Sequence, residues 1–364
     1  MNRVHYPALD GLRGIAILMV LFHHNFNFIP LSKFAWIGVD LFFVLSGFLV
    51  TEILLNTNGD SGYLRNFYVR RILRIFPIYY LTIIVFFIVA RFFSALNDQY
   101  IYYHNNQWML WMYMQNWLFI FKPPPSDNFL FQHFWSLAIE EQFYLIWPFI
   151  ILICKNQKKL LFLVYIFLAG CILFRIFCWI DYGANNLSFN LQYKTRIDGL
   201  CIGSIIAIWK FNKKNIKIRI IRLSIILISI HLVAIFCAKT MFKNVPHFNF
   251  FGFTSISVIF GMLLVYGLES KNQLTKNLLA NPAIRYIGKI SYGLYIFHYP
   301  VLMLFRMYSF TSWGLKGFWG LMVFGSMALI IAFITSSITY HFFERKILAI
   351  RDSFTKKNFP VFQK

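Results

Sequence analysis

The sequence predicts an all-α protein, a polytopic integral membrane bundle of about ten transmembrane helices with both termini in the cytoplasm. Of its 364 residues, 59% are hydrophobic and only 13% are charged, about half the average of roughly 25% in soluble proteins. Long apolar segments alternate with short polar ones, and the basic residues are divided unequally between alternate polar segments. The chain shows no internal repeat and no change of composition, so we expect a single transmembrane domain over residues 1–364.

The apolar segments are long enough to cross a bilayer, which takes about 20 residues of helix. The fourth and the sixth are short, so they either extend past their polar residues or are partly re-entrant. The first carries Arg13 at its mouth and no small-residue cleavage pattern follows it, so we expect a membrane helix there and not a signal peptide. The ten expected spans are residues 14–29, 36–55, 74–93, 141–154, 160–179, 198–211, 219–237, 251–268, 290–307 and 318–342.

The distribution of basic residues predicts the orientation of the bundle. Ten spans place both termini on one side, and 25 of the 35 Lys and Arg residues fall on that side. Nine fall on the opposite side, and Arg175 lies inside a span. Because cytoplasmic segments of membrane proteins are enriched in Lys and Arg, we expect both termini in the cytoplasm.

Two kinds of partner are not expected. The net charge of +22 could suit a nucleic acid, but the basic residues form short clusters between apolar segments. The enrichment of Lys and Arg in cytoplasmic segments of membrane proteins explains these clusters without a nucleic acid. The five cysteines lie in or beside apolar runs and include no C-x-x-C spacing, so neither a zinc site nor paired disulfides are predicted.

The longest polar segment, residues 94–140, is expected to be a loop on the outer side. It contains several Tyr and Trp residues and the run Pro123-Pro124-Pro125. The aromatic side chains either cover a sugar or lie at the lipid–water interface, where Trp and Tyr are common. The interfacial interpretation is the simpler one.

Charged side chains inside a membrane cost roughly 2.5–3.5 kcal/mol each, so the polar residues within the spans mark candidate functional residues. In the first span, Arg13 and His24 are eleven residues apart, close to three helical turns. They therefore project from one face, about 16 Å apart along the axis, with Arg13 at the inner mouth and His24 in the outer half. The alternative is that Arg13 only anchors the orientation and His24 is a core histidine. His23 lies on a different face.

The second span places Asp40 at about the depth of His24. Further in are Ser46 and Gly47, where a missing side chain permits either close helix packing or the passage of a thin ligand. At the inner surface, Arg71 and Arg74 share a face of the third span. Guanidinium groups match the oxygens of a phosphate, although the same arginines could only anchor the orientation and contact anionic lipid.

Four further charged residues enter spans from the outer side. Glu140 and Glu141 are adjacent carboxylates at the start of a membrane helix, which packing explains poorly, although a surface pair at the interface is the alternative. Arg196 and Asp198 enter the sixth span. His298 lies about half-way across the ninth. The inner mouth is thus basic and the outer half is rich in acids and bases, which suggests a ligand that enters phosphate-first inside while chemistry occurs outside.

The ordered set of these segments resembles the acyltransferase family 3 of membrane O-acyltransferases, which modify bacterial envelope glycans. The first segment leads to His24 and fits that family's pattern of a basic residue, ten residues and His. The five segments are YPALDGLRGIA at 6–16, GVDLFFVLSGF at 38–48, RRILRIFPIYY at 70–80, FWSLAIEEQFYLIWP at 134–148 and GKISYGLYIFH at 288–298.

This resemblance implies a multi-pass protein of the bacterial plasma (inner) membrane. It implies that an acyl group, usually acetyl, passes from cytoplasmic acyl-CoA to a hydroxyl of an extracytoplasmic or exported glycan. Lipopolysaccharide O-antigen and exopolysaccharide are examples of such acceptors, free or linked to a lipid carrier. Acetyl-CoA is then the donor, and no metal is implied.

We hypothesise a division of roles along this path. Arginines at the inner mouth hold the phosphates of CoA, and its pantetheine arm passes beside small residues to the first span. There His24 acts as general base on the sugar hydroxyl or is itself briefly acylated. Carboxylates orient its imidazole, and residues of the sixth span bind the acceptor. The residues meant are Arg13, Arg71 and Arg74 for phosphate, Ser46 and Gly47 for the arm, Glu140 or Glu141 with Asp40 for the imidazole, and Arg196 with Asp198 for the acceptor.

Two other classes of function fit the same composition. A transporter or flippase of a glycan or small solute would also have about ten spans and intramembrane charges, although no repeated half with paired broken helices is evident. A non-catalytic protein of a polysaccharide export complex is the second alternative.

Overall fold

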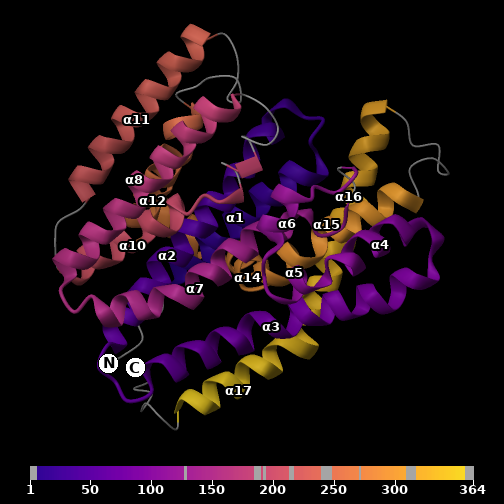
Figure 1. Cartoon of the computed structure of the whole chain (residues 1–364), viewed down its shortest axis with the longest axis horizontal. Helices are drawn as coiled ribbons and strands as arrows, with labels where there is room; N and C mark the ends of the chain where they lie inside the picture. Colours follow the sequence, from indigo (N-terminus) through magenta and orange to yellow (C-terminus); the bar gives the residue numbers. More distant parts are fainter. Residues whose placement is uncertain are drawn as a thin grey trace.

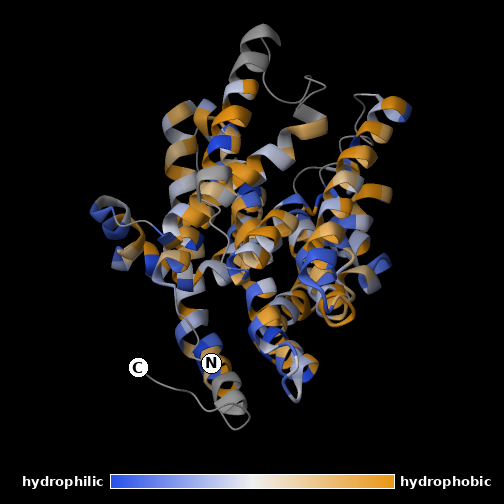
Figure 2. Ribbon diagram, turned by 90° about the vertical axis from the view of Figure 1, so that its left-hand side faces the viewer, coloured by the Kyte–Doolittle hydropathy of each residue, from blue (hydrophilic) through white to orange (hydrophobic). Residues whose placement is uncertain are grey.

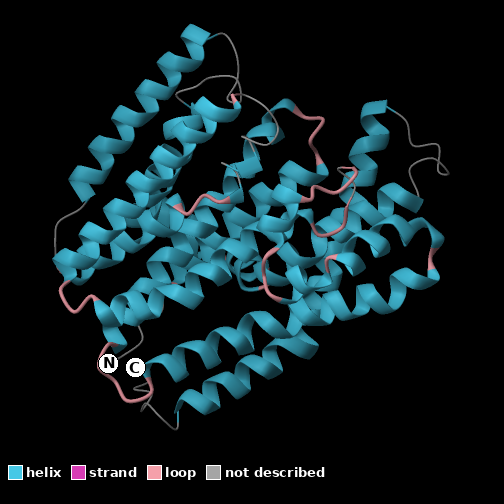
Figure 3. Cartoon of the chain, in the orientation of Figure 1, coloured by secondary structure: helices cyan, strands magenta, loops and turns pink. Residues whose placement is uncertain are grey.

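The structure is a computed structural model that describes residues 6–126, 129–183, 190–191, 194–212, 217–238, 248–269, 272–308 and 317–356. All regular secondary structure in these ranges is helical (Figures 1 and 3). An all-helical fold is what a bilayer requires of a chain with apolar spans, because a helix satisfies its own backbone hydrogen bonds. The prediction of an all-α fold is confirmed for these residues.

Each of the ten predicted spans overlaps with one helix of the structure. Within the residues that the structure describes, six stretches are long and apolar enough to cross a membrane, and Figure 2 shows hydrophobic residues along the long helices. The chain is therefore a multi-pass membrane protein, while the number ten and the orientation of the termini stay predictions. The helices are α1 (Pro7–Asn25), α2 (Gly38–Thr57), α3 (Tyr63–Val89), α7 (Trp135–Ile153), α8 (Gln157–Tyr182), α10 (Asp198–Phe211), α11 (Lys217–Ala238), α12 (Phe253–Glu269), α15 (Ser291–Tyr308) and α16 (Gly317–Thr339).

The helices are arranged around α1 and α2, which lie at the centre of Figure 1. There, α8, α10, α11 and α12 gather on the left, and α15 and α16 lie on the right. Shorter helices complete the bundle: η1 (Pro30–Ile37) joins α1 to α2, while α13 (Gln273–Ala280) and α14 (Pro282–Lys289) pack on α1. The last described helix, α17 (Arg345–Lys356), packs along α3.

The segment predicted as a long outer loop is largely helical. It forms α4 (Asn97–Asn105), α5 (Gln107–Trp111), α6 (Gln115–Phe121) and the short turn η4 (Gln132–Phe134). The hydroxyl of Tyr79 in α3 donates to the carbonyl of Leu110 at 2.7 Å, and that of Tyr80 donates to Trp111 at 2.9 Å. The segment is therefore anchored on α3. The predicted loop thus contains several short helices, because its aromatic residues pack against one another and against that helix.

The helices α2 and α10 lie in close contact, and their backbones approach one another through glycines. A β-carbon placed on Gly47 would lie 2.1 Å from the carbonyl oxygen of Leu200, and one placed on Gly203 would lie 2.1 Å from that of Val44. Small residues permit this approach in membranes. The space beside Gly47 is thus filled by α10, and the close helix packing that the sequence also allowed is the arrangement observed.

Candidate functional site

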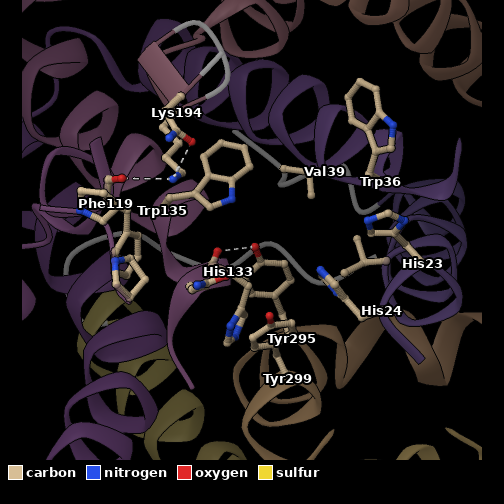
Figure 4. A pocket seen from close by; sticks show the side chains of 15 residues that line it. His23, His24, Trp36, Val39, Phe119, His133, Trp135, Lys194, Tyr295 and Tyr299 are labelled. Atoms are coloured by element: carbon tan, nitrogen blue, oxygen red, sulfur yellow. Dashed lines mark hydrogen bonds between the residues drawn. The ribbon is translucent and has the colours of Figure 1, made fainter. Parts of the chain in front are cut away.

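A cavity of about 270 Å³ lies at the end of α1 that carries His24. Segments far apart in the sequence meet there: the last turn of α1, η1, the start of α2, the segment after α6, the start of α7, and α15 (Figure 4). The cavity is lined mainly by aromatic, histidine and amide side chains: Val20, His23, His24, Trp36, Val39, Phe119, Pro123, Pro124, Gln132, His133, Trp135, Asn190, Lys194, Tyr295 and Tyr299. Such a wall suits an amphipathic ligand such as a sugar.

Burial of α1 places His24 at this cavity. Proline at the first helical position starts the helix, and Ile17, Val20 and Leu21 are buried against the neighbouring helices. His24 follows in the last turn and is half-buried. The neighbouring His23 hydrogen-bonds through Nδ1 to the carbonyl of Ser32 at 2.9 Å. The two adjacent histidines therefore have different surroundings.

The partner of His24 is His298 of α15. His24 Nδ1 lies 3.0 Å from His298 Nε2, and the ring of Tyr299 lies edge-on to His24 with 5.0 Å between the centroids. The ring of His133 lies 5.0 Å from that of His298. Among the described residues, no carboxylate makes a hydrogen bond or ion pair with His24. The structure thus puts a histidine where the sequence interpretation expected Glu140, Glu141 or Asp40.

A second polar group, which we call the arginine cluster, consists of Arg13, Ser46, Arg71, Glu140 and Tyr144. Ser46 Oγ donates to Glu140 Oε1 at 2.9 Å. The guanidinium of Arg71 lies 4.8 Å from the centroid of the Tyr144 ring. Arg13 pairs with Asp10 at 3.4 Å and interacts electrostatically with Arg71 and Glu140. Four helices, α1, α2, α3 and α7, therefore bring together residues that the sequence assigned to two different depths.

Glu140 lies in this cluster because α7 begins at Trp135 and not after residue 140. At 1.5 Å per residue, the five extra residues carry the carboxylate about 7.5 Å further along the helix than the sequence interpretation assumed. Glu141 interacts electrostatically with Glu140 and Arg71. Arg74 lies near Glu344 of the short helix η7 (Tyr340–Glu344), which precedes α17, and so faces a different neighbour from Arg71.

The two charged residues before and at the start of α10 are buried in ion pairs. Arg196 lies 3.5 Å from Asp40, with both side chains 1% exposed, and its guanidinium packs on the rings of Trp36 and Phe253. Trp36 also lines the cavity, so Arg196 stands directly behind the cavity wall.

Asp198 is held away from the cavity by Arg175. Both guanidinium nitrogens of that residue donate to Asp198, each at 2.9 Å, and Thr254 donates to the same carboxylate. Asp198 does not line the cavity. Its contacts are those of a structural ion pair between α8, α10 and α12.

Sequence reasoning left His298 and Arg175 without a role and did not single out His133 or Tyr299. The signal for Arg175 was available, because a charge in the middle of an apolar segment needs a buried partner. His298 ended one of the recognised motifs, but only the fold shows that α15 lies against the last turn of α1. His133 stood in the predicted loop, where no depth could be assigned to it.

The chemistry that this arrangement can perform is proton transfer. Three imidazoles line the cavity, those of His23, His24 and His133. That of His24 has its Nδ1 hydrogen-bonded behind the wall, to His298, and its other nitrogen has no hydrogen bond among the described residues. An imidazole hydrogen-bonded through one nitrogen is suited to general base or nucleophilic catalysis at the other. The described residues contain no group of three His, Cys, Asp or Glu side chains arranged for a metal ion.

Known proteins with similar sequences are O-acetyltransferases by name. The chain is 31% identical over 327 residues to the peptidoglycan O-acetyltransferase OatA of Listeria monocytogenes, which covers 83% of this chain and 50% of that protein. It is 31% identical to the putative peptidoglycan O-acetyltransferase YrhL of Bacillus subtilis, covering 94% of this chain and 55% of that protein. A putative O-acetyltransferase of Staphylococcus aureus, SACOL0978, is 28% identical, with 97% and 58% covered.

The chain spans about half the length of these relatives. No solved structure matches it. A family model described as an acyltransferase domain, that of acyltransferase family 3, matches residues 6–339, which is nearly the whole chain and includes the cavity, His24 and the arginine cluster. The chain therefore belongs to acyltransferase family 3.

Proposed function

We propose that the chain transfers an acetyl group from acetyl-CoA to a hydroxyl of a cell-envelope glycan held in the cavity beside His24. The single observation that carries this proposal is the position of His24. Its imidazole lies on the wall of a sugar-sized cavity at one end of α1, and Arg13 lies towards the other end of the same helix. The names of the relatives favour peptidoglycan as the glycan. The acceptor then reaches the cavity from the outer face of the plasma membrane.

The donor would be held at the arginine cluster. Arg13 and Arg71 are cations from two helices that interact with one another, and paired guanidinium groups bind the phosphates of a nucleotide well. Arg74 would contact the same phosphates from the next turn of α3. Glu140 hydrogen-bonds to Ser46 and balances part of the charge, which keeps the arginines in place. The roughly 16 Å between Arg13 and His24 is the span that the thin pantetheine arm has to cross.

In one version of the reaction, His24 is the general base. Its free nitrogen takes the proton of the sugar hydroxyl while the hydroxyl oxygen attacks the thioester carbonyl carbon. The carbon–sulfur bond breaks, the thiolate of CoA leaves and receives the proton from the imidazolium, and an acetyl ester remains on the sugar. Alternatively, a nitrogen of His24 attacks the thioester first, and CoA leaves as its thiolate. The sugar oxygen then attacks the acetyl carbon, the bond from that carbon to the ring nitrogen breaks, and the hydroxyl proton passes to the thiolate.

The roles of the other charged residues follow their contacts. Arg196 lies behind Trp36 and would hold this aromatic wall, and so the acceptor, in position through its pair with Asp40. Asp198 would contribute to the stability of the fold and would not contact the acceptor. Gly47 would allow the close packing of α2 on α10, so the pantetheine arm would pass beside Ser46 and would not contact Gly47.

The test is acetyl transfer in proteoliposomes. Acetyl-CoA labelled in the acetyl group is enclosed inside, and soluble peptidoglycan fragments are supplied outside and analysed by mass spectrometry. The proposal expects acetyl esters on the outer glycan that depend on the protein. Movement of label or glycan across the bilayer without ester formation would instead support a transporter and overturn the proposal.

A further inference from the structure

The hydrogen bonds of His298 determine which of its nitrogens carries a proton. His298 Nδ1 lies 3.0 Å from the carbonyl oxygen of Leu294 and 2.9 Å from that of Tyr295. A carbonyl oxygen only accepts hydrogen bonds, so Nδ1 must be the donor. These carbonyls belong to the preceding turn of α15 itself, which means that the helix backbone fixes the tautomer of this histidine.

His298 is a neutral imidazole in this position. It is 1% exposed, and no carboxylate of the described residues pairs with it. A buried and unpaired cation would cost several kcal/mol or more. A neutral imidazole has one donor and one acceptor nitrogen, so Nε2 of His298 is an acceptor.

The hydrogen bond to His298 in turn determines the tautomer of His24. Its Nδ1 lies 3.0 Å from the acceptor Nε2 of His298, so Nδ1 of His24 carries the hydrogen and donates it. The remaining nitrogen, Nε2, carries the lone pair. His24 lines the cavity, whereas His298 does not. The hydrogen bond therefore lies behind the wall, and Nε2 lies on the opposite edge of the ring.

We propose that His298 is a positioning residue that holds His24 in the Nδ1–H tautomer, so that the basic Nε2 faces the acyl acceptor in the cavity. This inference rests on the proposed function, since it assigns a task to a residue beside the acyl-transfer site. During the reaction His24 Nε2 takes the proton, and the acceptor nitrogen of His298 stabilises the imidazolium without itself receiving a proton. The same orientation would serve the alternative in which Nε2 is acylated.

Two substitutions separate positioning from packing. In His298→Leu the acceptor is lost, and we expect kcat to fall on the order of tenfold to a hundredfold, with the KM for acetyl-CoA nearly unchanged, because a mis-set tautomer removes catalysis and not binding. In His298→Gln the side-chain carbonyl can accept from His24 Nδ1, and we expect kcat to recover to within about fivefold of the parent protein, the scale of one hydrogen bond. His341→Leu, at an exposed histidine of η7 (Tyr340–Glu344), is the matched control.

A spectroscopic measurement reads the tautomer without any need for activity. The full chain is labelled with ¹⁵N-histidine, reconstituted in lipid, and compared with His24→Ala so that the signals of His24 are identified by difference. The inference expects a protonated Nδ1 and an unprotonated Nε2 for His24 in the parent protein, and loss of this preference in His298→Leu.

The outcomes distinguish this inference from the proposed function. A His24 protonated on Nε2 in the parent protein, or equal loss of kcat in His298→Gln and His298→Leu, would overturn the positioning role even if acetyl transfer depends on His24. A protonated Nδ1 together with full transfer in His24→Ala would instead overturn the proposed function and leave the tautomer assignment standing.

Discussion

Substitution of Asp198 by Asn is expected to destabilise the protein without a specific effect on binding of the glycan acceptor. The side chains of Arg175 and Asp198 are 2% and 1% exposed, and two N–O contacts of 2.9 Å join them. Removal of one charge leaves the guanidinium buried without its counter-charge. Breaking a buried ion pair in this way costs about 3–5 kcal/mol, which is a factor of about 10²–10⁴ in the unfolding equilibrium.

The assay is equilibrium unfolding of the purified protein in mixed micelles, followed by Trp fluorescence. Asp198→Asn and Arg175→Met should each lower the unfolding free energy by this amount. The double variant Arg175→Met, Asp198→Leu removes both charges, so it should recover much of the loss. Asp181→Asn, at an exposed carboxylate near the end of α8, is the control and should change little.

A different result would restore the role that the sequence suggested. If Asp198→Asn leaves the unfolding free energy unchanged and raises the KM for the glycan fragment, then Asp198 contacts the acceptor, and the structural ion pair is the wrong explanation of its burial.

Three further predictions concern the donor path and the helix packing. Arg71→Gln should raise the KM for acetyl-CoA about tenfold or more with a smaller change in kcat, as initial-rate kinetics would show, because a phosphate contact serves binding; an unchanged KM would remove Arg71 from the donor site. Ser46→Ala should lower the stability of the arginine cluster by about 1–3 kcal/mol because it removes one of the hydrogen-bond donors of Glu140, and unchanged thermal unfolding would contradict that hydrogen bond. Gly203→Val should reduce the yield of folded protein in size-exclusion chromatography, because its β-carbon would overlap the carbonyl of Val44; a normal yield would show that α2 and α10 can move apart.

The positions of the helices could be predicted from the sequence because apolar length alone determines them. The sixth predicted span, residues 198–211, has the same bounds as α10, although its length had suggested a partly re-entrant segment. The start of α7 could not be predicted, since only three consecutive apolar residues, 137–139, stand there between the polar Ser136 and Glu140. That error placed Glu140 at the depth of His24, whereas the structure places it beside Ser46 and Arg71.

The pairing of side chains across helices was beyond sequence reasoning. One-face spacing along α1 related Arg13 to His24 without any tertiary information. The neighbour of His24 depends instead on how α15 packs on α1, and His298 is 274 residues away in the chain. The role of Gly47 could not be predicted for the same reason. A glycine in an apolar helix can leave space for a ligand or allow close contact with another helix, and only the position of the facing helix distinguishes the two.

The measurement that tests the account most directly is the single-turnover rate of acetyl transfer by His24→Ala in proteoliposomes. Loss of a general base or nucleophile should lower the rate by a factor of about 10²–10⁴, while His23→Ala, which removes the adjacent histidine of the same wall, should lower it much less. The unfolding free energy of both variants should match the parent protein within about 1 kcal/mol. Transfer by folded His24→Ala at the parent rate would contradict the account, because no other described residue is assigned the reacting nitrogen.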